Sequence, residues 1–63
     1  MIRVKLNQTI YDIGYGNGLY FARASFGDSP FGRTLEELAE GLSQCTGLKK
    51  EDIIEYLSEQ FSD

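Results

Sequence analysis

The chain has 63 residues, a net charge of −4 and a single cysteine, Cys45. A domain this small buries only about 60% of the surface that its unfolded chain exposes, so its stability is marginal without help. One thiol excludes an internal disulfide, and the absence of histidine excludes the usual zinc sites. We therefore expect one domain, residues 1–63, without metal or cofactor, that gains stability from a homodimer or a constitutive partner.

The lone cysteine also predicts a reducing compartment, and we expect a cytoplasmic protein. The opening residues, MIRVKL, are too charged for an export signal, and no apolar run approaches the length of a membrane span. We expect a complete small reading frame of the kind found in phages and bacteria.

The first strand pair is predicted from IGYGNGLYF, residues 13–21, which places three glycines within five positions. Asn17-Gly18 is typical of a type I′ hairpin turn, because both of its central positions need φ above zero. A dinucleotide-binding loop instead reads G-x-G-x-x-G and leads into a helix, whereas G-x-G-x-G here leads into a second strand. The pattern therefore predicts a turn and no phosphate site.

Counting outward from this turn sets the register of the hairpin. One face is predicted to hold Tyr11, Ile13, Tyr15, Tyr20, Ala22, Ala24 and Phe26. On the other face Asp12 lies opposite Arg23, and Phe21 lies opposite Gly14, where its ring can cover the exposed backbone. A shift of one residue would mix the two faces, so the separation itself supports this register.

A second hairpin is predicted upstream, with a two-residue turn at Asn7-Gln8 that pairs residues 2–6 with the strand after it. The apolar residues of 2–6 then join the apolar face, and Arg3 lies opposite Asp12. A row of charges, Arg3, Asp12 and Arg23, would cross three strands. Asn-Gln is a weaker turn signal than Asn-Gly, which leaves a longer loop open at this position.

Residues 27–33, GDSPFGR, are predicted to form a loop, and two helices follow it. Thr34 and Glu37 form a capping box at the start of the first helix, and Gly47 suits a left-handed end. The second helix is predicted from about Lys50 to Phe61. The inner stripes of the two helices are Leu35, Leu38, Ala39, Leu42 and Cys45, and Ile53, Ile54, Leu57 and Phe61.

These elements predict an α+β fold: a three-stranded antiparallel β-meander followed by two α-helices packed on one sheet face (β-β-β-α-α). The other sheet face would stay uncovered. It would present Arg3, Lys5, Ile10, Asp12, Leu19, Phe21 and Arg23.

Catalysis is not expected, because the chain has no histidine to act as a base and its serines have no evident activating partner. A helix-turn-helix reading of residues 35–57 is rejected as well. The connection between its helices is too long, and the recognition helix would bring Glu51, Asp52, Glu55 and Glu59 to the phosphates.

Binding remains, and two surfaces qualify because charge is divided unevenly. Residues 1–33 carry four cations against two carboxylates, whereas residues 34–63 carry two cations against eight carboxylates. We predict a non-enzymatic protein-binding module, a regulator or inhibitor that occupies a partner's surface. The contact is either the uncovered sheet face or the acidic helices, where the candidate residues are Glu51, Asp52, Glu55 and Glu59. The alternatives are a nucleic-acid-binding sheet face, with Phe21 among cations, and an acidic mimic of nucleic acid.

The stretch GNGLYFARASFGDSPFGRTLEELAE, residues 16–40, resembles the N-terminal part of HicB-type antitoxins. Both have a glycine turn, a strand, and a loop that ends in a Gly-Arg-Thr-Leu-Glu-Glu-Leu-like helix start. The loop of that family typically contains a Pro-Gly-Cys-like segment, where this chain has Ser29-Pro30-Phe31-Gly32. Residues 41–63 offer no counterpart of that family's DNA-binding tail, so we assign no family on this stretch.

Overall fold

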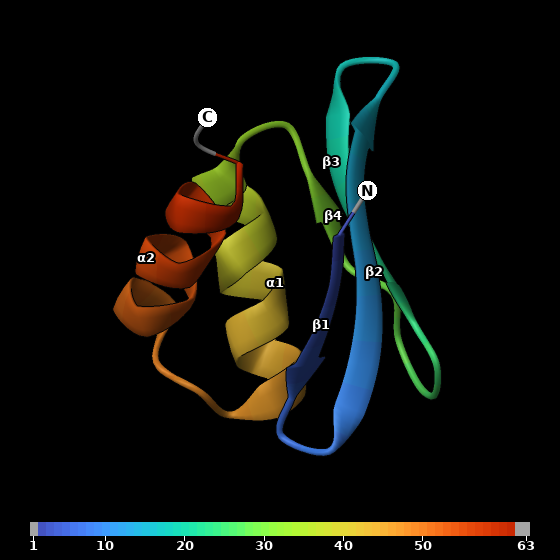
Figure 1. Ribbon diagram of the computed structural model, residues 1–63, viewed down its shortest axis with the longest axis vertical. Helices are drawn as coiled ribbons and strands as arrows, with labels where there is room; N and C mark the ends of the chain where they lie inside the picture. The colour runs from blue at the N-terminus through green and yellow to red at the C-terminus, as the bar shows by residue number, and fades with distance from the viewer. Residues whose placement is uncertain (1, 62–63) are drawn as a thin grey trace.

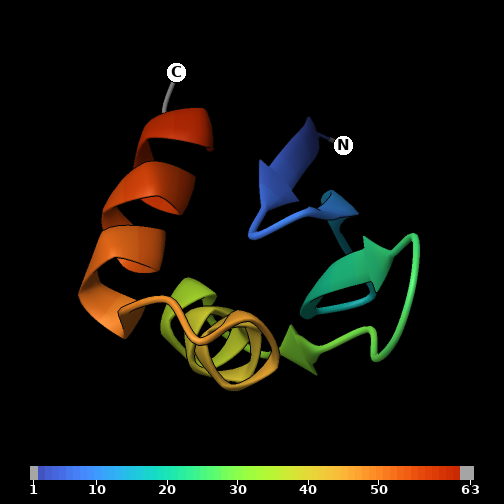
Figure 2. The same ribbon diagram turned by 90° about the horizontal axis from the view of Figure 1, so that it is seen from below.

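Four antiparallel strands form one open sheet in the order β1-β2-β3-β4 in the computed structural model, which describes residues 2–61. The strands are β1 (Ile2–Leu6), β2 (Thr9–Gly16), β3 (Leu19–Ala24) and β4 (Phe31–Gly32), and the helices are α1 (Leu35–Thr46) and α2 (Lys50–Gln60). Both helices lie on the same side of the sheet (Figure 1; Figure 2). The predicted α+β class is confirmed, and the ends of the predicted 1–63 domain, residues 1 and 62–63, lie outside the described residues.

The register of both hairpins is confirmed. Ile13 pairs with Ala22 across β2 and β3, and with Ile2 across β1 and β2. Asn17 and Gly18 have φ of 53° and 79°, as a type I′ turn requires. The predicted turn at Asn7-Gln8 is also a two-residue turn, in which these residues have φ of 50° and 76°.

Gln8 holds a left-handed backbone conformation that favours glycine, so Gln8→Gly is expected to stabilise the protein by about 0.5–1 kcal/mol. Gln8→Ala removes the same side chain but keeps the unfavourable φ, and it serves as the control. Urea unfolding measures both variants. A midpoint that rises equally in the two variants would contradict the backbone explanation.

The prediction of a loop over residues 27–33 is wrong at its end, where β4 adds a fourth strand to the meander. Phe31 pairs with Phe21, and Gly32 pairs with Tyr20. The approach to β4 also bonds to β3, because Ala22 N–H donates to the Pro30 carbonyl at 2.9 Å. Two residues are too few to show an alternating pattern, so the Gly and Pro content predicted only a loop.

The core lies between the sheet and the helices. It comprises the buried side chains of Val4, Tyr11, Ile13, Ala22, Leu38, Ala39, Leu42, Ile53 and Leu57. α1 lies against β3 and β4, and α2 packs against α1. The ring of Phe61, at the end of α2, meets Tyr20 of β3 edge-on at 5.7 Å between centroids, so the helix layer closes over the sheet.

Three residues predicted on the inner face are exposed. Phe26 is 86% exposed, because β3 ends at Ala24 and the chain turns away from the sheet. Tyr15 is 59% exposed at the far end of the hairpin, where it only stacks on Tyr20. Cys45 is exposed as well, and Thr46 is buried in its place.

The burial of Thr46 in place of Cys45 has a simple geometric reason. Thr46 lies four residues after Leu42, and this spacing keeps it on the buried stripe of α1. Its hydroxyl donates to the Leu42 carbonyl at 2.7 Å, so burial leaves no polar atom unpaired. Its own carbonyl accepts from Asn7 Nδ2 at 2.6 Å, which ties the end of α1 to the first hairpin turn.

The ends of α1 agree with the predicted capping signals, except that one hydrogen bond of the capping box is shifted by one residue. Thr34 Oγ1 accepts from Glu37 N–H at 3.1 Å, and Gly47 ends α1 with φ of 80°. Glu37 Oε1 accepts from the N–H of Arg33, one residue before the position that a capping box uses. Within residues 2–61, neither helix has the length and hydrophobicity needed to cross a membrane.

Candidate functional site

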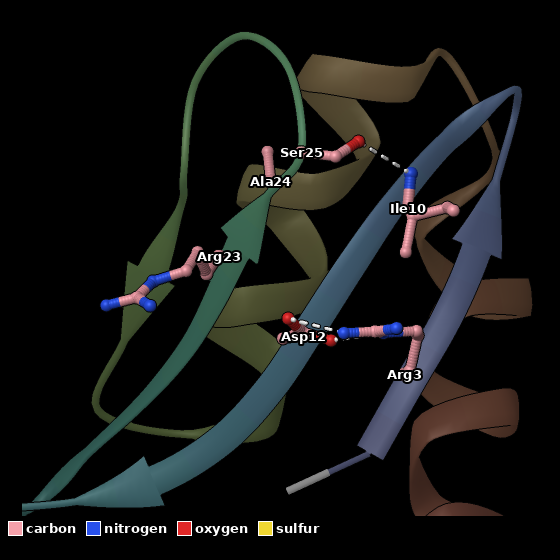
Figure 3. Close-up of a pocket in the computed structure, with 6 residues that line it drawn as sticks. All are labelled: Arg3, Ile10, Asp12, Arg23, Ala24 and Ser25. Atoms are coloured by element: carbon pink, nitrogen blue, oxygen red, sulfur yellow. Dashed lines mark hydrogen bonds and ion pairs between the residues drawn. The ribbon is translucent and has the colours of Figure 1, made fainter.

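The sheet face opposite the helices, called the open face below, is not covered by any element of residues 2–61. Figure 3 looks onto this face, with the sheet in front and the helices behind it. Strand alternation places the following residues on it: Arg3, Lys5, Ile10, Asp12, Gly14, Leu19, Phe21, Arg23 and Phe31. All six open-face residues predicted as contact candidates are therefore brought together on one surface.

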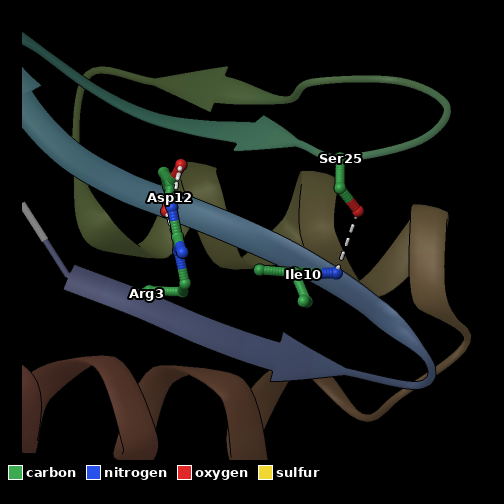
Figure 4. A network of polar contacts seen from close by, with 4 residues as sticks. All are labelled: Arg3, Ile10, Asp12 and Ser25. Carbon is green, nitrogen blue, oxygen red and sulfur yellow. Dashed lines mark hydrogen bonds and ion pairs between the residues drawn. The ribbon is translucent and has the colours of Figure 1, made fainter.

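An ion pair joins two strands near the middle of the open face. Arg3 Nε donates to Asp12 Oδ1 at 2.8 Å, and Arg3 Nη2 donates to Asp12 Oδ2 at 3.5 Å (Figure 4). The guanidinium holds the pKa of Asp12 below its usual range, and the carboxylate raises the pKa of Arg3. Asp12, the one carboxylate that residues 2–61 place on this face, is thus neutralised by a neighbour.

Arg23 behaves differently from the predicted row of charges. It lies opposite Asp12 in the register, but its side chain points away from Asp12 and toward β4 (Figure 3). Among the described residues it makes no ion pair within 4 Å. Its guanidinium is therefore free to meet a negative group of a partner.

The Arg3–Asp12 pair gives a pH dependence with a definite sign. Because the pKa of Asp12 is lower in the folded protein, the pair adds stability above the unfolded pKa, and this stability is lost as the pH falls through the folded value. We expect Asp12→Asn to be less stable than wild type near neutral pH. The difference should begin to shrink near the unfolded pKa of about 4 and should vanish only below the lowered pKa of the folded protein. Thermal unfolding of both proteins across this range tests the sign. A constant difference at every pH would contradict it.

Two phenylalanines form the aromatic part of the open face. The Phe21 ring lies so close over Gly14 that an added Cβ on this glycine would stand 2.8 Å from Phe21 Cζ, which confirms the predicted cover. Phe31 lies opposite Phe21 on β4 and is 68% exposed. Sequence reasoning missed Phe31 because β4 was not foreseen. The signal was an aromatic residue within an otherwise small and polar loop.

A shallow hollow of about 260 Å³ opens on this face beside the ion pair (Figure 3). It is lined by Arg3, Ile10, Asp12, Arg23, Ala24 and Ser25. Ser25 closes one end, because its N–H donates to the Ile10 carbonyl at 2.8 Å and its Oγ accepts from Ile10 N–H at 3.3 Å (Figure 4). Two arginines line the hollow, and one of them, Arg3, is already paired with Asp12.

The acidic candidates lie elsewhere. Glu51, Asp52, Glu55 and Glu59 are all exposed on α2, whose buried side is formed by Ile53 and Leu57. α2 belongs to the helix layer, on the other side of the sheet from the open face (Figure 2). The structure thus separates the two predicted contact surfaces and does not combine them in one site.

No group of three acidic or thiol side chains within residues 2–61 is arranged to hold a metal ion. In comparisons with known proteins, no protein-family model, no curated protein and no solved structure matches the chain. The resemblance of residues 16–40 to HicB-type antitoxins rests on those residues alone.

Proposed function

We propose that this chain is a non-enzymatic protein-binding module, a small regulator or inhibitor that acts by covering a partner's surface with its open face. The observation that carries the proposal is the composition of this uncovered face. Exposed apolar side chains, above all Ile10 and Phe31, lie among the cations of Arg3, Lys5 and Arg23. Apolar anchors combined with arginine are typical of the energetic centres of protein interfaces.

The acidic surface of α2 supports the proposal less well. Its exposed side carries carboxylates and one half-exposed aromatic ring, that of Tyr56. Acidic helices of small proteins are often only solvated, and charge alone provides attraction at a distance but few anchors. The proposal also includes a cytoplasmic location, for which the lone cysteine is the support.

Site-specific photo-crosslinking tests which face is used. A benzophenone amino acid replaces Phe31 on the open face or, in the matched control, Ser58, an exposed residue of α2. Irradiation in cells is expected to give a discrete adduct from position 31. A double change on the open face, Phe21→Ala with Arg23→Glu, should abolish this adduct, whereas Glu55→Lys with Glu59→Lys should leave it intact.

The opposite pattern would overturn this assignment. Adducts from position 58 that the α2 charge reversal abolishes would make the acidic helix the contact surface. Absence of adducts from both positions would remove the protein-binding proposal. If the adduct at position 31 has twice the mass of the chain, the partner is a second copy, and light scattering over a dilution series should then show a dimer.

A second candidate function, binding of single-stranded RNA, is favoured by one observation. Phe31 joins Phe21 on neighbouring strands, with the free Arg23 directed toward β4, and stacking rings beside a cation suit bases and phosphates. Retention of a short RNA at low salt is the test. Phe21→Ala and Arg23→Glu should each weaken it, and the affinity should fall steeply with salt. No retention at low salt would remove this candidate.

A further inference from the structure

The free edge of β1 offers unpaired backbone groups in a definite pattern. β1 is one edge strand of the sheet, and β4, the other edge, has only two residues. In a hairpin with a two-residue turn, the pair that flanks the turn exchanges both hydrogen bonds, and every second pair after it does the same. Leu6, Val4 and Ile2 therefore bond to β2, so the N–H and C=O groups of Arg3 and Lys5 face outward.

The same alternation holds on the other side of the sheet, where the bonds beyond the strand ends can be checked. Counting from the second turn, Ile10 should face β3, and Ser25 N–H does donate to its carbonyl. Ala22 should face away from β2, and its N–H does donate to the Pro30 carbonyl. The assignment of outward groups on β1 follows the same count.

The edge of β1 lacks two of the features that close other sheet edges, since it contains no proline and its register with β2 runs from Ile2 to Leu6 without a bulge. Charged side chains also protect an edge against unselective pairing, and β1 carries two of them. The exposed side chains of Arg3 and Lys5 stand on the open face, beside the same residues' outward backbone groups. An added strand would therefore meet two positive side chains in neighbouring hydrogen-bonded positions. Arg3 already shares its charge with Asp12, whereas Lys5 makes no ion pair within residues 2–61.

This charge pattern selects against a second copy of the chain. Antiparallel pairing of two β1 strands over all five residues centres on Val4, and Arg3 then lies opposite the second copy's Lys5 on either side of this centre. Like charges in directly opposite positions destabilise a strand pair, whereas carboxylates in those positions would stabilise it.

We infer that the free edge of β1 binds an extended segment of a partner protein that carries carboxylates at alternate positions, opposite Arg3 and Lys5. The segment adds a fifth strand and continues the open face. This inference rests on the proposed function and names the chemistry of the partner. Main-chain hydrogen bonds supply the attachment, and the two charge pairs set the register and the preference.

The probe is the capped peptide Thr-Glu-Val-Glu-Thr, which reads the same in both directions and so presents its two glutamates whichever way it pairs. Titration into the isotope-labelled protein is followed by the chemical shifts and hydrogen exchange of backbone amides. Shifts and slowed exchange are expected at the amides of Arg3 and Lys5, while those of Val4 and Leu6 already bond to β2. The peptide Thr-Lys-Val-Lys-Thr should bind about tenfold more weakly or worse, because both charge pairs become repulsive.

Two variants of Lys5 distinguish the contribution of its charge from that of its backbone N–H group. Lys5→Ala removes one charge and keeps the outward N–H, so the preference for the glutamate peptide should fall but binding should persist. Lys5→Pro also removes the N–H, which an edge strand tolerates because that group faces away from β2 and bonds to no neighbour among residues 2–61, and binding should be lost. The amide spectrum of each variant confirms that it is folded.

The inference is wrong if the glutamate peptide shifts no β1 amide, if both peptides bind equally, or if Lys5→Pro binds as well as Lys5→Ala. If the peptide test fails while the crosslinked adduct from position 31 persists, the edge of β1 is not the contact and the open face remains the contact surface. Loss of that adduct as well would remove the proposed function itself.

Discussion

Replacing Gly32 with alanine is expected to destabilise the fold by about 2–3 kcal/mol. A Cβ added at this glycine would stand 2.6 Å from Glu37 Cβ and 2.7 Å from Leu38 N. Leu38 N is a backbone atom of α1 and Glu37 Cβ is bonded directly to that backbone, so neither can yield as the far end of a flexible side chain can. The helix would have to move away from β4, and Phe31 would lose its place beside Phe21.

Gly16→Ala is the matched control, because Gly16 also lies in a strand but has no atom within 4 Å of an added Cβ. The free energy of unfolding of Gly16→Ala should differ from that of wild type by less than about 1 kcal/mol. Urea unfolding at equal protein concentration compares the two variants. If Gly32→Ala unfolds at the wild-type midpoint, the close packing of α1 on β4 is not a stabilising feature of the fold.

The contact at Gly32 also shows why sequence reasoning found three strands and missed the fourth. The register of β1, β2 and β3 follows from two local facts, a turn that needs positive φ and a side-chain period of two. β4 has no such local signal. It exists because Pro30 and Ser29 accept hydrogen bonds from β3 and because α1 closes over Gly32, and both are tertiary contacts.

The candidate site was predictable to a similar extent. Register alone placed Arg3 beside Asp12, and the structure shows the ion pair. Register could not give the direction of Arg23, because a long side chain reaches several positions from one backbone site. Cys45 was misplaced for a related reason, since three-residue and four-residue spacings both suit a helix face and only the packed structure selects Thr46.

Leu57→Ala is the second change with a large expected effect, and it tests how α2 is held. The Leu57 side chain is fully buried, and with Ile53 it forms the buried side of this helix. Truncating a buried leucine costs about 2–5 kcal/mol, through lost burial and the cavity that remains. A domain of this size has a total stability of only a few kcal/mol, roughly 0.05–0.15 kcal/mol per residue. Leu57→Ala should therefore unfold a large fraction of the protein.

Tyr56→Ala provides the control on the same helix, because the Tyr56 side chain is 40% exposed and is not part of the buried core. Its cost should stay below about 1 kcal/mol. Hydrogen exchange distinguishes two ways in which Leu57→Ala could act. Loss of protection in α2 alone would mean that the helix detaches from a sheet that persists, and the acidic surface would be a separable part. Equal loss in β2, which we expect from the shared core, would make the open face and α2 one cooperative unit.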